Sequence, residues 1–125
     1  MNRWAVVACL LALPALPALA ETRRVAVVVG NNAGSGDLAP LRYAESDAGK
    51  MARVLVELGE VSSDDVLLLL GRPVSELERA LADARDRVAA FKKNPDTRVV
   101  LLFYFSGHSD GDGLEMGGTS LAFAR

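Results

Sequence analysis

Three short hydrophobic runs and two longer amphipathic segments alternate along the chain. The runs cover residues 24–30, 66–70 and 98–105, and their apolar residues are mostly continuous rather than alternating with polar ones. Continuous runs of this length are typical of strands buried on both faces of a parallel sheet. The pattern therefore predicts three buried strands, with the β-branched run of residues 24–30 as the central one.

Between these runs, apolar residues recur every three or four positions, which indicates amphipathic helices. The first helix is predicted to end at Gly59, after a stripe made of Ala44, Ala48, Met51, Leu55 and Leu58. The second is predicted to begin with a capping box of Ser75 and Glu78 and to end near Asn94 and Pro95. Its apolar stripe consists of Leu77, Leu81, Ala84, Val88 and Phe91.

The order strand, helix, strand, helix, strand predicts right-handed crossovers and a doubly wound, mostly parallel α/β sheet covered by helices. Three strands and two helices form an incomplete sheet of this kind, because an apolar edge strand would be left unpaired. We therefore interpret residues 21–125 as the N-terminal part of a longer domain and expect pairing through the sheet edge. The Gly-rich residues 110–118 are predicted to form a flexible loop.

The first twenty residues have the features of a signal peptide. Arg3 supplies a positive start, residues 4–13 are apolar, and residues 18–20 form a small-x-small cleavage site. The apolar stretch is too short for a permanent membrane anchor, which needs roughly 20 residues. We expect export to a periplasmic or secreted location. Cys9, the only cysteine, lies within this segment and is interpreted as part of its apolar region rather than as a lipid-attachment site.

Composition limits the classes of protein and partner that fit the chain. With 125 residues, 50% hydrophobic and 24% charged, it holds one globular domain at most. The signal segment contains one base, Arg3, and no acid, so the net charge of −2 becomes −3 without it. That balance argues against nucleic acid as a partner. A mature segment without a thiol also excludes a disulfide, a cysteine metal site and a cysteine nucleophile from these residues.

The only histidine, His108, directly follows the third predicted strand in a small, polar stretch, residues 106–111. The carboxyl ends of strands in open α/β sheets form the crevice in which ligands bind. An imidazole exchanges protons near neutral pH, so this position suits acid–base chemistry. His108 is therefore the first candidate for a catalytic residue.

Three motifs in order resemble the caspase and metacaspase superfamily of cysteine peptidases, most closely its bacterial caspase-like group. They are a hydrophobic strand ending in Gly-Asn-Asn at residues 25–32, Leu-Arg-Tyr-Ala-Glu-Ser-Asp-Ala at residues 41–48, and a strand ending in Tyr-Phe-Ser-Gly-His at residues 100–108. The resemblance covers nearly all of residues 24–118. It implies a sheet of the caspase-hemoglobinase type, a polypeptide substrate and no cofactor.

The resemblance makes His108 the histidine of a Cys-His dyad, acting as general acid or base. The cysteine nucleophile of this family follows its histidine by roughly 50 residues, which places it beyond Arg125. Ser109 stands where the family usually has a glycine whose backbone N–H helps to bind the oxyanion. A serine can donate the same N–H unless the backbone needs a positive φ. Arg42 does not fall in register with the pocket arginine of caspases.

Other interpretations stay open. A non-catalytic caspase-like binding module would share the fold without the chemistry. Residues 34–39 fit the pattern G-x-G-x-x-[GA] between a strand and a helix, so a small dinucleotide-binding domain is a rival. Asp110, Asp112 and Glu115 lack the spacing of an EF-hand calcium loop, and no metal site is predicted. Asp47 is interpreted as a structural acid near the positive end of a helix dipole.

Overall fold

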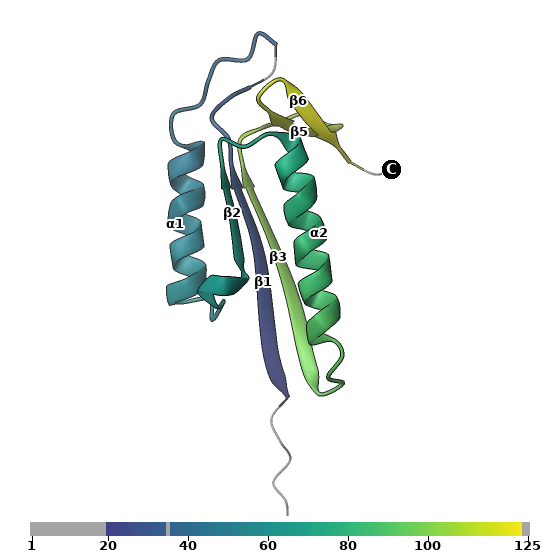
Figure 1. Ribbon diagram of the computed structural model, residues 1–125. Helices are drawn as coiled ribbons and strands as arrows, with labels where there is room; N and C mark the ends of the chain where they lie inside the picture. The colour runs from purple at the N-terminus through teal and green to yellow at the C-terminus, as the bar shows by residue number, and fades with distance from the viewer. Residues whose placement is uncertain (1–19, 35, 124–125) are drawn as a thin grey trace, which may run out of the picture.

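The described part of the chain is a parallel three-stranded sheet with a helix on each face and a small antiparallel sheet at one end (Figure 1). This is a computed structural model, and it describes residues 20–34 and 36–123. In chain order the elements are β1 (Glu21–Gly30), α1 (Ala44–Glu57), a short 3-10 helix (Ser63–Asp65), β2 (Val66–Leu70), α2 (Val74–Phe91), β3 (Thr97–Ser106), β4 (His108–Ser109), β5 (Gly113–Met116) and β6 (Thr119–Ala122).

The parallel sheet has the order β2-β1-β3, so β1 is the central strand as its sequence predicts. It pairs with β3 along its whole length, from Glu21 opposite Thr97 to Gly30 opposite Ser106. Its pairing with β2 covers only residues 26–30. The doubly wound α/β fold class is thereby confirmed.

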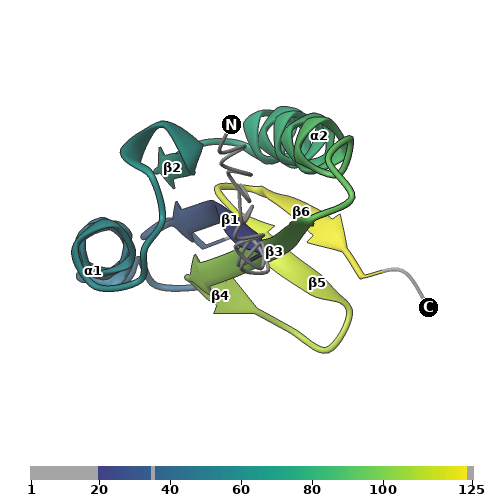
Figure 2. The same ribbon diagram turned by 90° about the horizontal axis from the view of Figure 1, so that it is seen from below.

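The core of the molecule consists of two layers, one on each face of β1. Val25, Val27 and Val29 contact the cluster under α2, whereas Ala26 and Val28 contact the cluster under α1. All five side chains are fully buried, and burial of each valine stabilises the fold by about 1.5–3 kcal/mol. Figure 2 shows the two helices covering opposite faces of the sheet. The continuous run of β-branched residues is thus explained by burial on both faces.

Gly30, the last residue of β1, allows α1 to pack directly against the end of the strand. A Cβ atom at this position would lie 2.6 Å from the carbonyl oxygen of Ala44 and 2.7 Å from the Cβ of Ala48. Both residues belong to the first turns of α1 and are buried. The missing side chain therefore fixes how closely α1 approaches the carboxyl end of the sheet.

The predicted capping box of α2 is wrong. The helix begins at Val74 with Pro73 at its N-cap, so Ser75 lies within the first turn and Pro73 makes no side-chain cap bond. The carbonyl oxygen of Pro73 accepts the first helical bonds, from the N–H groups of Glu76 and Leu77. Pro73 has extended backbone (φ −73°, ψ 163°), which stops the preceding segment and starts the helix two residues earlier than predicted.

The prediction of a flexible loop at residues 110–118 is also wrong, because these residues form β5 and the turns that join it to β4 and β6 in an antiparallel sheet. The Asp110 side chain organises the first turn, since its Oδ1 accepts hydrogen bonds from the N–H groups of Asp112 and Gly113 at 2.8 Å. Leu114 and Met116 are buried in the cluster under α2. A local side-chain turn and two buried apolar residues thus order a glycine-rich segment.

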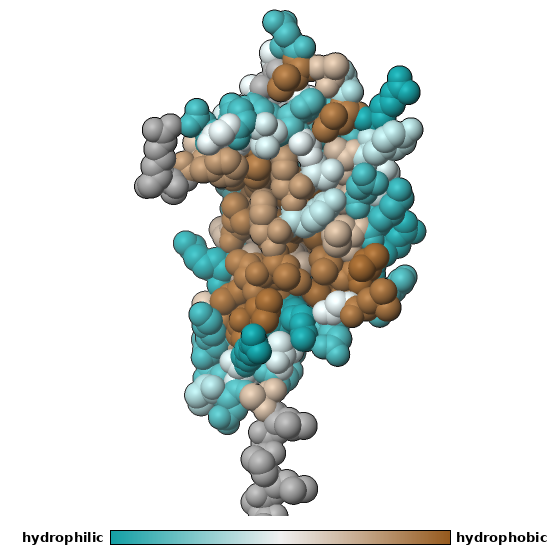
Figure 3. All heavy atoms as spheres, turned by 180° about the vertical axis from the view of Figure 1, so that it is seen from behind, coloured by the Kyte–Doolittle hydropathy of each residue, from teal (hydrophilic) through white to brown (hydrophobic). Residues whose placement is uncertain are grey.

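The outer edge of β3 is uncovered. No strand within residues 20–34 and 36–123 pairs on that side, and Leu101 and Phe103 of β3 are half exposed. Seen from behind, the molecule presents a broad hydrophobic area (Figure 3). An unpaired edge of this kind can accept a further strand, and the pairing through it that the sequence predicts stays a prediction.

The predicted signal peptide and Cys9 lie outside the described residues, apart from Ala20. In the part of the chain that the structure describes, no helix is both long and apolar enough to cross a membrane.

Candidate active site

His108 lies at the topological switch point of the parallel sheet. From β1 the chain turns to one side, through α1 to β2, and then crosses through α2 to β3 on the other side. The strand order therefore reverses between β1 and β3, and open α/β sheets bind ligands at the carboxyl ends of the strands at such a point. A hydrogen bond of 2.9 Å from the N–H of Asn31 to the carbonyl oxygen of Ser106 joins the two strand ends just before His108.

The described residues of the loop after β1, 31–34 and 36–41, are bonded to one another at the two ends of the loop and to α1. The N–H of Leu41 donates to the carbonyl oxygen of Asn32 at 2.7 Å. Asn32 also exchanges two bonds with Glu45 at the start of α1: its side-chain oxygen accepts from the N–H of Glu45, and its own N–H donates to Glu45 Oε1, each at 3.2 Å. Asn32 thus satisfies one free N–H of the helix N-terminus from outside the helix.

Asn31 fixes the other side of this loop. It is almost fully buried, and its amide nitrogen donates to the carbonyl oxygen of Arg72 at 3.1 Å while its amide oxygen accepts from the N–H of Ala33 at 2.9 Å. In the sequence, the Asn-Asn pair was identified only as part of the first motif, and neither asparagine was assigned a role. Its signal was two amide side chains directly after a buried strand, where loop backbone needs hydrogen-bond partners.

The imidazole of His108 contacts this loop. Its Nε2 lies 2.9 Å from the carbonyl oxygen of Ala39, and because a carbonyl can only accept, this contact assigns the ring proton to Nε2. The neutral ring then keeps its lone pair on Nδ1. Ala39 precedes Pro40, and a residue before proline is restricted to extended backbone, which limits the directions its carbonyl can take. The loop therefore orients the ring and selects its tautomer.

Ser109 is exposed and pairs with Leu114 in the antiparallel ladder of β4 and β5. Among the described non-glycine residues, only Glu60 has a positive φ, so the backbone at Ser109 does not require glycine. The N–H of Asp110 donates to the carbonyl oxygen of Gly113 at 3.2 Å. Since hydrogen-bonded and non-hydrogen-bonded pairs alternate in such a ladder, the N–H of Ser109 points away from β5.

The remaining candidates have local structural surroundings. Arg42 is exposed in the loop before α1, and Asp47 in the first turn of α1 lies 3.3 Å from the ammonium group of Lys50. Asp110 forms the turn described above. The residues that the structure describes contain no group of three His, Cys, Asp or Glu side chains that could hold a metal ion.

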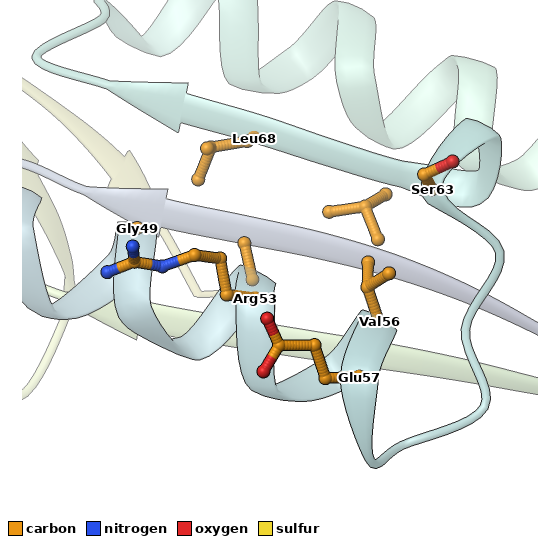
Figure 4. A pocket seen from close by; sticks show the side chains of 8 residues that line it. Gly49, Arg53, Val56, Glu57, Ser63 and Leu68 are labelled. Atoms are coloured by element: carbon orange, nitrogen blue, oxygen red, sulfur yellow. The ribbon is translucent and has the colours of Figure 1, made fainter.

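A separate hollow of about 330 Å³ lies between α1 and β2, and Figure 4 shows the side chains that line it. Its walls come from the middle and end of α1, from the short 3-10 helix and from β2, including Val56, Ser63 and Leu68. None of these residues belongs to the loops at the carboxyl end of the sheet. We therefore take the hollow as a packing gap beside the edge strand rather than as the reactive site.

Comparison with known proteins agrees with the arrangement of these elements. A family model described as the caspase domain matches residues 23–120. No curated protein and no solved structure matches the chain.

Proposed function

Because this chain belongs to the caspase domain family, which at the family level consists of cysteine peptidases, we propose that it carries the histidine half of a caspase-like endopeptidase site. His108 is the dyad histidine in this proposal. The observation that supports it best is the hydrogen bond from His108 Nε2 to the carbonyl oxygen of Ala39. That bond leaves Nδ1 as the nitrogen with which a thiol can interact.

In the proposed reaction, Nδ1 of His108 takes the proton from a cysteine thiol, and the thiolate sulfur attacks the carbonyl carbon of the peptide bond. The C–N bond then breaks, and the imidazolium returns its proton to the leaving amine. Water hydrolyses the resulting thioester and regenerates the thiol. Throughout, Ala39 holds the ring through the nitrogen that takes no part in proton transfer.

The backbone N–H of Ser109 is the proposed donor to the oxyanion that forms on the substrate carbonyl. Two features support it. The N–H points away from β5, and the backbone at this position accepts a side chain without a positive φ. The substitution of serine for the usual glycine is therefore compatible with the role.

The proposal extends to the location, the partners and the extent of the domain. The signal peptide of residues 1–20 directs export to the periplasm or the exterior, the substrate is a polypeptide, and nucleic acid is not a partner. Residues 21–125 are the N-terminal part of the catalytic domain, and the nucleophile follows it. The uncovered edge of β3 pairs with a further segment.

A second candidate, a caspase-like module that binds partners without catalysis, is favoured by the uncovered edge of β3, where Leu101 and Phe103 are half exposed. Reading the frame past the codon for Arg125 separates the two. A cysteine with small neighbours, after a further strand and roughly 50 residues past His108, supports the peptidase. A stop codon at that point overturns it and leaves the binding module.

In the full-length product, His108→Ala should lower the rate of peptide hydrolysis by about 10²–10⁴-fold, because the base that activates the thiol is lost. The rate is measured on a set of short fluorogenic peptides. Lys50→Ala, on the exposed face of α1, serves as the control and should keep the wild-type rate. Unchanged turnover in His108→Ala would remove the assignment.

A further inference from the structure

Two positions of the glycine pattern at residues 34–39, Gly34 and Ala39, lie next to the His108 ring, and the proposed mechanism uses only Ala39. We propose that Gly34 is a positioning residue for His108. Because Gly34 has no side chain, the imidazole packs against it and is held at the carbonyl oxygen of Ala39. The catalytic meaning of this position rests on the proposed function. The geometry itself does not depend on it.

Gly34 touches the edge of the ring that carries Nε2. A Cβ atom at this position would lie 3.0 Å from Cδ2 and 3.2 Å from Nε2 of His108, and 2.6 Å from the Cβ of Leu38. The last distance is shorter than real Cβ contacts, and the first two are tighter than most. A side chain at position 34 therefore forces the loop, the ring or both to move.

Space, and not backbone conformation, is the reason for glycine here. Among the described glycines, those with positive φ are Gly36, Gly71, Gly117 and Gly118. Gly34 is outside that set, so its backbone can accept an alanine. Gly36 shows the opposite case, because it has a φ of 59° and a Cβ there would meet nothing within 4 Å.

Any relief of the crowding disturbs the bond to Ala39. The Cβ of Leu38 is fixed to the backbone, so it can retreat only if the chain at Leu38 shifts, and the next residue is Ala39. The ends of the loop cannot follow freely, because Asn32 is bonded to both Leu41 and Glu45. The alternative is rotation of the imidazole away from Gly34. In both cases Nε2 loses its contact with the carbonyl oxygen of Ala39.

The same contacts give the residues of the apparent dinucleotide motif another explanation. Gly34 makes room for the ring, Gly36 turns the chain with a positive φ, and Ala39 supplies the carbonyl oxygen that accepts from His108. A dinucleotide pyrophosphate would need a free helix N-terminus. At α1 the N–H of Glu45 is already taken by the Asn32 side chain.

The tautomer of His108 tests the proposal without any activity measurement. His108 is the only histidine of the 125-residue chain, so selective ¹⁵N labelling of histidine rings gives the Nδ1 and Nε2 signals of one residue, in solution or in a sedimented sample. The wild type should show one neutral tautomer with the proton on Nε2. Gly34→Ala should show a loss of that single tautomer in favour of a mixture.

Gly111→Ala is the matched control, because Gly111 lies three residues after His108, has no positive φ, and a Cβ there would meet nothing within 4 Å. It should keep the wild-type tautomer. If Gly34→Ala keeps it as well, the proposal is overturned.

Should Gly34→Ala fail to give the wild-type far-ultraviolet circular dichroism, the double variant Gly34→Ala with Leu38→Gly decides the question. Removal of the Leu38 Cβ relieves the closest contact, so recovery of both the fold and the single tautomer supports the proposal. A double variant that stays unfolded, or that folds with the mixture of tautomers, overturns it. A missing nucleophile downstream would remove the peptidase function but leave every one of these ring signals unchanged, so the two failures are distinguishable.

Discussion

The two ends of the parallel sheet are held together in different ways. At the amino end, charged side chains join three elements: Asp65, which is almost fully buried, accepts from Arg23 of β1 at 3.2 Å and from Arg87 of α2 at 3.3 Å. The guanidinium of Arg23 also lies 4.2 Å from the centre of the Phe91 ring. Arg87 further contacts Asp83 at 3.1 Å and the carbonyl oxygen of Asp64.

At the carboxyl end, backbone groups and side-chain amides make most of the contacts that join the elements. The side chains of Asn31 and Asn32 bind backbone groups of their own loop, of the loop before α2 and of the first turn of α1, and His108 is held by a carbonyl oxygen. Glycines at positions 30, 34 and 107 bring backbone, helix and ring within distances that a Cβ would prevent.

The difference shows how one sheet separates stability from function. When a buried ion pair loses one partner, the folded state is destabilised. The paired side chains also fill the space between the elements that they join. Backbone bonds and glycine contacts hold the loops closely and leave the side chain of His108, the proposed dyad histidine, partly exposed. Single substitutions at each end test this contrast.

Gly30→Ala should give the largest loss of stability. Its Cβ would meet Ala44 and Ala48 of α1 within 2.7 Å, and because these atoms belong to a helix backbone and a buried side chain, they cannot retreat without moving α1. We expect the free energy of unfolding to fall by about 1–3 kcal/mol or more, as for other overpacked cores. The measurement is chemical denaturation followed by circular dichroism.

Gly49→Ala on α1 is the control for that substitution. A Cβ at Gly49 would meet nothing within 4 Å, and alanine in a helix is more stable than glycine by about 0.5–1 kcal/mol. A Gly30 variant as stable as this control would show that the close packing of α1 on β1 is not needed.

Asp65→Ala should remove the shared acceptor of the amino end. The two arginines are partly exposed and can turn to water, so we expect a loss of about 1–3 kcal/mol, below the 3–5 kcal/mol seen when a fully buried pair loses one partner. Asp64→Ala is the control, because its side chain is exposed and its carbonyl oxygen, which binds Arg87, is kept. The ring signals of His108 should stay those of the wild type, since the substitution lies at the far end of the sheet.

Asn31→Ala makes the complementary test at the carboxyl end. It removes the partner of the carbonyl oxygen of Arg72 and of the N–H of Ala33. Both belong to exposed residues and can turn to water, so we expect a loss of about 0.5–1.5 kcal/mol for each hydrogen bond. Stability should thus fall by no more than in Asp65→Ala. Unlike that variant, it should also change the tautomer of His108, because Ala33 precedes Gly34 in the loop. Equal ring signals in both variants would contradict the separation of the two ends.

The buried strands could be predicted from the sequence, and the contacts of the site could not. Residues 24–30 predict a central strand, because burial on both faces requires continuous apolar side chains. The position of His108 at the end of β3 is predicted by the same kind of apolar run. The bond between His108 and Ala39 joins residues 69 positions apart, and no periodicity carries that information. The strands β5 and β6 were missed because Leu114 and Met116 gain their stability from burial under α2, which is a tertiary effect.

The smallest effect is expected when the pH is raised, on the contribution of Arg87 to the free energy of unfolding. The hydrogen bond to Asp83 raises the pKa of Arg87, with smaller raising contributions from Asp65 and an opposing one from burial. A group whose pKa is raised on folding contributes stability that is present below its unfolded pKa and is lost only as the pH rises through its folded pKa. Both values lie above the range in which the protein can be studied. The difference in unfolding free energy between the wild type and Arg87→Met should therefore be the same at pH 7 and pH 10, measured by denaturation at both values. A difference that shrinks at pH 10 would mean that a group other than Arg87 controls this end of the sheet.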